Sequence, residues 1–168
     1  SSSSAASDVY KRQDIKDMVW NGDKDTLMIT ENTQPAILTM SVAALRVAER
    51  LGLTPDVVAG LSLGEYTAHV ASGSMEFTDA VKLVKKRGKY MQEEVPLGVG
   101  AMAAIIALTP EDVKEICKQA SSKGICEPAN FNCPGQITVA GEVAAVEYAC
   151  ELAKEKGAKR AMLMPVSA

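Results

Sequence analysis

The motif Gly60-Leu61-Ser62-Leu63-Gly64, which follows the short apolar run 57–59, constrains this chain more than any other feature. An apolar run, a serine between glycines and then helix-forming residues predict a strand at 57–60, a sharp turn at Ser62 and a helix over 63–71. The glycines leave room for a strained turn that lifts the serine away from the sheet. The motif therefore predicts an α/β fold with Ser62 as a candidate nucleophile.

A nucleophilic serine needs further groups, and the sequence supplies only some of them. The backbone amide of Leu63, at the start of the predicted helix, can donate to an oxyanion. A general base must also take the serine proton. The single histidine of the chain is His69, seven residues after Ser62, and we expect it to be a packing or surface residue. The alternative interpretation of the motif is a small-residue turn with a buried serine hydroxyl.

Composition excludes several classes of protein. The 168 residues are 47% hydrophobic and 23% charged, as in a globular protein of one domain or a domain and a half. Only 4% are aromatic, which favours an aliphatic α/β core. A net charge of −3 gives no electrostatic case for nucleic acid, and no apolar run is long enough to span a membrane.

The cysteines Cys117, Cys126, Cys133 and Cys150 form no C-x-x-C pair and have no flanking histidines. This spacing predicts neither a zinc site nor a disulfide framework. We therefore expect reduced thiols, a cytoplasmic location and no metal.

Both ends of the sequence are unusual. The serine-rich residues 1–13 resemble an appended leader, which we expect to be non-native or disordered. The apolar, strand-like stretch 160–168 stops without a cap. We therefore expect a fragment of a longer protein.

Three helices besides 63–71 are predicted in the first half. One covers 14–21, one begins with Pro35 near its first position and ends at Leu51, and one covers 79–94 after a cap at Thr78. The helix of Pro35 is apolar almost all round, so we expect it to be largely buried.

The second half predicts a β-α-β-β-α-β order, the ferredoxin-like split βαβ pattern. Thr109 and Pro110 form a strong helix start, with a cap and a proline at the first position. The predicted strands are 101–108, 125–130, 136–140 and 160–166. One predicted helix begins at Pro110 and ends near Ser121, and the other covers 142–156.

Arg87 is the second candidate for a functional residue. Ala80, Val84, Arg87 and Met91 share one helix face, which turns the arginine toward the core side. An inward guanidinium pairs best with a carboxylate. That carboxylate belongs to a substrate or to an internal ion pair, unless Arg87 snorkels at an edge.

Several motifs together resemble a known family. They are Thr33-Gln34-Pro35-Ala36, the Ser62 motif with Glu65-Tyr66, Arg87-Gly88 with Met91-Gln92, Gly100-Ala101-Met102-Ala103-Ala104, and Pro165-Val166-Ser167-Ala168. In this order and at this spacing they resemble the malonyl-CoA:acyl carrier protein transacylases, from about Asp14 to Ala168. The resemblance implies that 14–97 is part of an incomplete α/β-hydrolase-like large domain and 98–166 an inserted ferredoxin-like small domain.

The resemblance also implies roles for particular residues. Ser62 matches the serine that takes the malonyl group from malonyl-CoA and passes it to the phosphopantetheine thiol of acyl carrier protein, in fatty acid biosynthesis. Leu63 matches the oxyanion donor, Arg87 the residue that binds the malonyl carboxylate, and Asn132 lies in a segment that lines the cleft. No cofactor is expected beyond the CoA thioester as substrate, and the full-length protein is expected to be a monomer.

The chain departs from the family at three points, the first being that the upstream Gly-Gln-Gly-Ser-Gln segment, which supplies the family's other oxyanion donor, is absent. Leu61 stands where the family usually has histidine, and the family's catalytic histidine lies a few residues beyond Pro-Val-Ser-Ala. We therefore expect the chain alone to be inactive. A polyketide-type acyltransferase domain and an α/β-hydrolase serine esterase remain alternatives. Arg87 favours a carboxylated acyl group but does not separate malonyl from methylmalonyl.

Overall fold

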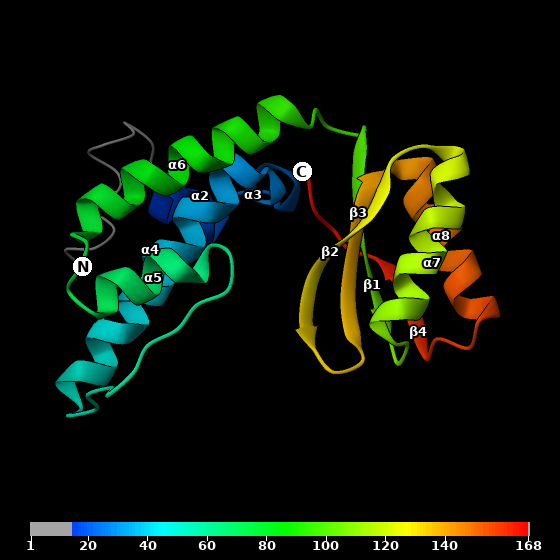
Figure 1. Cartoon of the computed structure of the whole chain (residues 1–168). Helices are drawn as coiled ribbons and strands as arrows, with labels where there is room; N and C mark the ends of the chain where they lie inside the picture. The colour runs from blue at the N-terminus through cyan, green and yellow to red at the C-terminus, as the bar shows by residue number, and fades with distance from the viewer. Residues whose placement is uncertain (1–14, 168) are drawn as a thin grey trace. The chain divides into compact units, whose positions relative to one another are not determined.

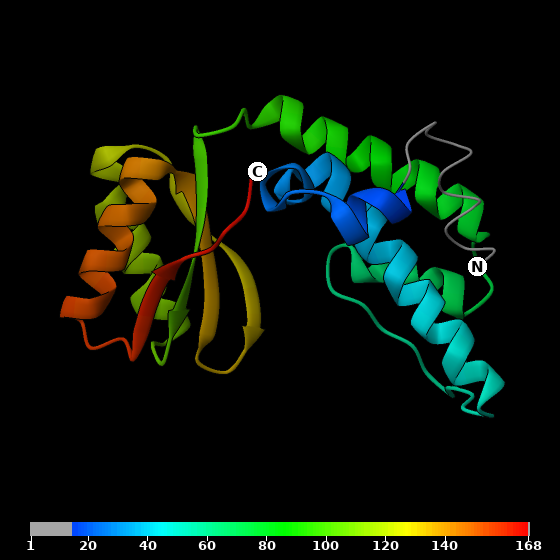
Figure 2. The same ribbon diagram turned by 180° about the vertical axis from the view of Figure 1, so that it is seen from behind.

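The computed structural model describes residues 15–167, so the predicted leader 1–13 lies outside the described residues. The chain divides into two compact units, with the boundary between Glu94 and Val95. Figures 1 and 2 show the elements of each unit from opposite sides.

The first unit is helical in its described part. Val42 of α4, Val70 of α5 and Val84 of α6 meet in its core. Gly88 of α6 allows a close helix crossing, because a Cβ there would lie 2.8 Å from the Cα of Glu31.

Among the helices of residues 15–167, none has the length and apolar character needed to span a membrane. The helices are α2 (Ile15–Asn21), α3 (Lys24–Met28), α4 (Thr30–Arg50), α5 (Gly64–Ala71) and α6 (Phe77–Glu94).

Two predicted helix starts are wrong. α4 begins at Thr30, so Pro35 lies inside the helix. Residues before α4 stabilise this additional first turn, because the Thr33 hydroxyl donates to the carbonyls of Leu27 and Ile29. α6 begins at Phe77, so Thr78 lies within the helix and is not its cap.

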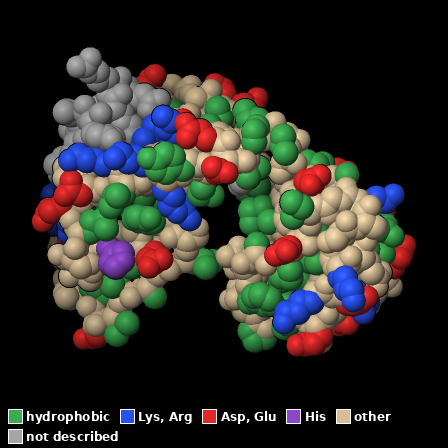
Figure 3. Space-filling model, turned by 45° about the horizontal axis from the view of Figure 1, so that its top comes forward, with side chains coloured by type: hydrophobic (Ala, Val, Ile, Leu, Met, Phe, Trp, Pro, Cys, Tyr) green, Lys and Arg blue, Asp and Glu red, His purple; other side chains and the backbone are tan. Residues whose placement is uncertain are grey.

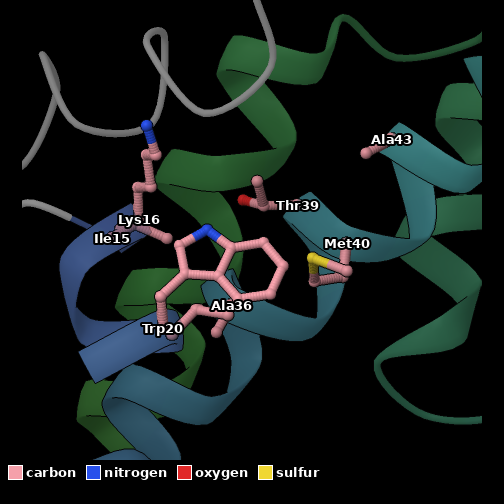
Figure 4. A pocket seen from close by; sticks show the side chains of 8 residues that line it. Ile15, Lys16, Trp20, Ala36, Thr39, Met40 and Ala43 are labelled. Atoms are coloured by element: carbon pink, nitrogen blue, oxygen red, sulfur yellow. The ribbon is translucent and has the colours of Figure 1, made fainter. Parts of the chain in front are cut away.

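The prediction that α4 is buried almost all round is also wrong. Met40 is 49% exposed and Val47 is 56% exposed. Within the described residues, the buried side chains of α4 all lie between Gln34 and Val42, so apolar side chains farther along the helix stay exposed. A hollow of about 310 Å³ lies between α2 and α4. Figure 4 shows the Trp20 ring beside Ala36, Thr39 and Met40 in this hollow.

The strand predicted at 57–60 is absent, and the side chain of Val57 is 85% exposed. A strand is held by hydrogen bonds to a neighbouring strand. The described part of the first unit contains no other strand. An apolar run without that partner stays irregular.

The second unit confirms the predicted order of elements. Its four strands form an antiparallel sheet in the order β2-β3-β1-β4, and α7 and α8 cover one face of it (Figures 1 and 2). The elements are β1 (Gly100–Ile106), α7 (Pro110–Ala120), the short 3-10 helix η1 (Ser121–Lys123), β2 (Cys126–Cys133), β3 (Gln136–Glu142), α8 (Val143–Glu155) and β4 (Arg160–Leu163).

Strand register places the core of this unit on the helix side of the sheet. Ile105 of β1 lies opposite Ile137 of β3, and both side chains are buried. Alternate residues along each strand point to the same face, so this register brings their neighbours Ala103 and Val139 to the same core. The Thr109 cap is confirmed as a reciprocal capping box with Asp112.

Candidate active site

Ser62 lies on a strained turn at the start of α5. Its φ is 53°, in the left-handed region that residues other than glycine rarely adopt. Gly60 makes the turn possible, because a Cβ there would lie 2.0 Å from the carbonyl carbon of Gly64. A Cβ on Gly64 would meet nothing within 4 Å, so only the first of the two glycines is required by space. The predicted sharp turn therefore forms without the predicted strand.

Leu63 is the N-cap residue of α5. The adjacent amides are used by the turn, since Gly64 donates to the Leu61 carbonyl and Glu65 to the Ser62 carbonyl. Within residues 15–167 we find no acceptor for the Leu63 amide. This N–H group is thus available beside the hydroxyl of Ser62 at the positive end of the helix.

Arg87 reaches the candidate nucleophile directly. Its Nη2 donates a hydrogen bond of 2.9 Å to Oγ of Ser62, and its Nη1 donates one of 2.6 Å to Oε1 of Gln34. The guanidinium carbon also lies 5.9 Å from the ring centre of Tyr66. The face predicted from periodicity holds for its neighbours, since Ala80 and Val84 are fully buried.

No ion pair neutralises Arg87 within the described part of the chain. Its contacts are instead a neutral amide, a neutral hydroxyl and an aromatic ring. An uncompensated, partly buried guanidinium attracts an anion, and a carboxylate matches its geometry. The site thus combines an exposed hydroxyl, an available amide donor and a positive charge.

Gln34 is the site residue that reasoning from the sequence did not assign. Its side chain is 4% exposed. Its Nε2 donates to Oγ1 of Thr30 at 3.0 Å and lies 3.3 Å from Sδ of Met91, which orients Oε1 toward Arg87. The spacing Gln34, Leu38, Val42 places a polar side chain on a buried helix face, and that irregularity was the available signal.

Asn132 is placed in the other unit, on β2. Its Nδ2 donates to Oγ1 of Thr138 at 3.3 Å. Its role in lining a cleft stays a prediction.

His69 does not contact Ser62. Its Nδ1 lies 3.0 Å from Oγ of Ser74, and its Nε2 lies 4.0 Å from Oε1 of Glu65. The ring is half exposed and is the purple side chain in Figure 3. His69 is therefore a surface residue, and its ring bonds Ser74 in the segment that follows α5.

The described residues offer no metal site. No group of three or more His, Cys, Asp or Glu side chains converges within residues 15–167. All four cysteines are free thiols, and only Cys133 is exposed.

Comparison with known proteins assigns the class of this protein. A model of the acyl transferase domain matches residues 5–167, and the chain belongs to that family. The match begins inside the segment 1–13 that we expected to be a leader.

The relatives narrow the class further. The chain is 48% identical over 154 residues to the malonyl CoA-acyl carrier protein transacylase of Bacillus subtilis (strain 168), covering 91% of this chain and 49% of that protein. It is 48% identical over 155 residues to the Escherichia coli (strain K12) transacylase of the same name, covering 92% and 50%. The chain thus spans about half the length of these relatives.

Solved structures of transacylases have the same α/β fold. The malonyl CoA-acyl carrier protein transacylase of Coxiella burnetii matches with a TM-score of 0.93 at 43% identity, covering 99% of this chain and 53% of that one. A malonyl-transacylase in complex with its type II polyketide acyl-carrier protein matches with a TM-score of 0.91 at 43% identity, covering 99% and 54%.

Proposed function

We propose that the protein transfers a malonyl group from malonyl-CoA to the phosphopantetheine thiol of an acyl carrier protein in fatty acid biosynthesis. One observation carries the proposal: the uncompensated guanidinium of Arg87 donates to the hydroxyl of Ser62. A nucleophile with a fixed positive charge beside it suits an acyl group that ends in a carboxylate. The names of the relatives agree with this substrate.

The first half of the reaction follows from the contacts of Ser62. Its Oγ attacks the thioester carbonyl, and the Leu63 amide donates to the oxyanion that forms. The C–S bond then breaks, the CoA sulfur leaves as a thiol and Ser62 carries a malonyl ester. In the second half the carrier thiol attacks this ester and Oγ recovers its proton.

The Gln34 bond decides which edge of Arg87 the substrate meets. Nη1 is held by Oε1 of Gln34, so the edge formed by Nε and Nη2 is the one offered to the malonyl carboxylate. Two parallel N–H···O bonds on that edge would fix the acyl group with its carbonyl near Oγ of Ser62.

The proton acceptor is the part of this chemistry that the described residues do not supply. Within residues 15–167, the side-chain partner of Oγ of Ser62 is Arg87, which is a donor. His69 bonds Ser74 instead. We assign no base from these residues.

We also propose a domain assignment. The strand order β2-β3-β1-β4 with two helices on one face supports a ferredoxin-like small domain over 98–166. The turn of Ser62 supports an α/β-hydrolase-like large domain that includes 14–97. The free cysteines support a cytoplasmic location.

The acyl-enzyme gives the direct test. The protein produced from its intact gene is incubated with malonyl-CoA, and its intact mass is measured. We expect one malonyl adduct, lost in Ser62→Ala and kept in Ser74→Ala, which removes the neighbouring exposed serine that bonds His69. An adduct that persists in Ser62→Ala would refute the proposal.

The carrier protein has two candidates. A polyketide carrier is the second one, because one structural neighbour was solved with a type II polyketide acyl-carrier protein. Transfer rates from the malonylated enzyme to a fatty acid carrier and to a polyketide carrier distinguish them.

A further inference from the structure

Two cysteine sulfurs touch in the core of the second unit. Sγ of Cys117, in the last turn of α7, lies 3.8 Å from Sγ of Cys126, the first residue of β2. The two side chains are 3% and 2% exposed. A disulfide needs the sulfurs about 2.05 Å apart, and the two sulfurs already lie in contact with no other atom required between them. The proposed acyl transfer uses neither residue.

We propose that Cys117 and Cys126 are a modification site, a dithiol that a peroxide oxidises to an intrachain disulfide. The Cys126 thiolate attacks the peroxide, the O–O bond breaks, and Cys126 becomes a sulfenic acid while the peroxide leaves as water or an alcohol. The Cys117 sulfur then attacks that sulfenic sulfur, the S–O bond breaks, and water leaves with the Cys117 proton. Two electrons pass from the thiols to the peroxide.

The roles within the pair follow from the contact between the sulfurs. The hydrogen bond between the two sulfurs lowers the pKa of Cys126, against burial, which raises it. The same contact raises the pKa of Cys117, and burial adds to this effect. One proton shared between two sulfurs makes the first ionisation easier and the second harder. Cys126 is thus the attacking sulfur and Cys117 the resolving one.

Cys150 is a buried thiol of the same core for which residues 15–167 show no side-chain hydrogen bond, although the charge of Cys126 affects its pKa. It is 7% exposed, and burial is the main cause that raises its pKa. A buried thiol of that kind behaves as a small apolar side chain and is inert. The contact between the sulfurs, and not burial, therefore distinguishes the Cys117–Cys126 pair.

The segment between the two cysteines gives an oxidant access. It consists of η1, Gly124 and Ile125, and the side chain of Ile125 is 66% exposed. Two of its bonds are long, from Gly124 N to the Ser121 carbonyl at 3.5 Å and from Ile125 N to Oε1 of Glu142 at 3.3 Å, while Glu142 N donates to the Ile125 carbonyl at 2.8 Å. A short 3-10 turn with such bonds opens locally at low cost.

The test uses Cys133→Ser/Cys150→Ala, a double variant that keeps only the proposed pair. Trypsin releases Cys117 in peptide 115–118 and Cys126 in peptide 124–154. After hydrogen peroxide treatment under native conditions and blocking of free thiols, we expect these two peptides to be joined and to separate on reduction with dithiothreitol. The oxidised chain should melt roughly 10 °C higher than the reduced chain, because the cross-link restricts the unfolded state.

Controls separate the proposal from general oxidation. Cys117→Ser and Cys126→Ser should form no such cross-link while keeping the circular dichroism of the parent. In the chain that keeps all four cysteines, fragmentation of the joined peptide should locate the bond at Cys126. In that same chain, free thiols at Cys117 and Cys126 after treatment that oxidises the exposed Cys133 would overturn the proposal. A bond from Cys126 to Cys150 would also overturn it. A cross-link that forms only in urea would overturn it as well.

Discussion

Nη2 of Arg87 donates a 2.9 Å hydrogen bond to Oγ of Ser62, which precedes it by 25 residues in the sequence. The contact joins the turn before α5 to the middle of α6. It places the positive charge of the Arg87 guanidinium beside the hydroxyl of Ser62 before any substrate binds. Binding of a carboxylated acyl group then needs no rearrangement of the guanidinium, which is held by Gln34.

Arg87→Ala should therefore reduce malonyl transfer far more than acetyl transfer. Loss of a desolvated charge contact costs about 2–5 kcal/mol, which lowers kcat/KM roughly 30- to 5,000-fold for malonyl-CoA. Lys86→Ala, which removes the exposed neighbouring charge, should change neither rate. Equal losses with malonyl-CoA and acetyl-CoA would show that Arg87 is structural.

Gln34→Met should weaken malonyl transfer while keeping side-chain length. The amide oxygen holds Nη1 of Arg87, and a hydrogen bond to a charged group contributes about 1.5–3 kcal/mol, so kcat/KM for malonyl-CoA should fall roughly 10- to 150-fold. The exposed Gln119→Met is the control. A matching fall in acetyl transfer would contradict a positioning role.

Gly60→Ala and Gly64→Ala form a matched pair at the turn. A methyl group at Gly60 would overlap the carbonyl of Gly64, whereas a methyl group at Gly64 has open space. We expect the first change to cost about 1–3 kcal/mol of stability and to abolish the malonyl adduct. The second should do neither. Urea unfolding followed by the fluorescence of Trp20, the single tryptophan, reports on this unit.

His69→Gln should leave the malonyl adduct on Ser62 unchanged. The ring bonds Ser74 and not the nucleophile, so only the end of α5 loses a contact. Adduct formation is measured by intact mass at several times after mixing. A drop comparable to that of Ser62→Ala would make His69 the general base after all.

Asp112→Asn should reduce the acid sensitivity of the second unit. The Thr109 hydroxyl and then the Lys156 ammonium hold the pKa of Asp112 below its ordinary value of 3.8. Because the folded pKa is the lower one, this carboxylate stabilises the fold above about pH 4 and loses that contribution as the pH falls further. The measurement is the thermal midpoint by circular dichroism at pH 6 and pH 3. Glu111→Gln, in the same helical turn, should keep the parent's dependence on pH.

Predictions of secondary structure from the sequence were most accurate where the signals come from neighbouring residues. The Thr109 cap, the Pro110 start and the order of elements after Gly98 are confirmed, because caps and alternating strands are set by neighbouring residues. The strand at 57–60 failed for the opposite reason. An apolar run becomes a strand only when another strand lies beside it, and the described part of that unit offers none.

The sequence by itself determined the turn of Ser62, since Gly60 is the residue that lets the backbone pass the Gly64 carbonyl. It also predicted, through helical periodicity, that Arg87 lies on the helix face shared with the buried Ala80 and Val84. Only the tertiary structure decided what Arg87 meets there. Its partners Gln34 and Ser62 precede Arg87 by 53 and 25 residues in the sequence. Periodicity within one helix carries no information about the side chains of another element.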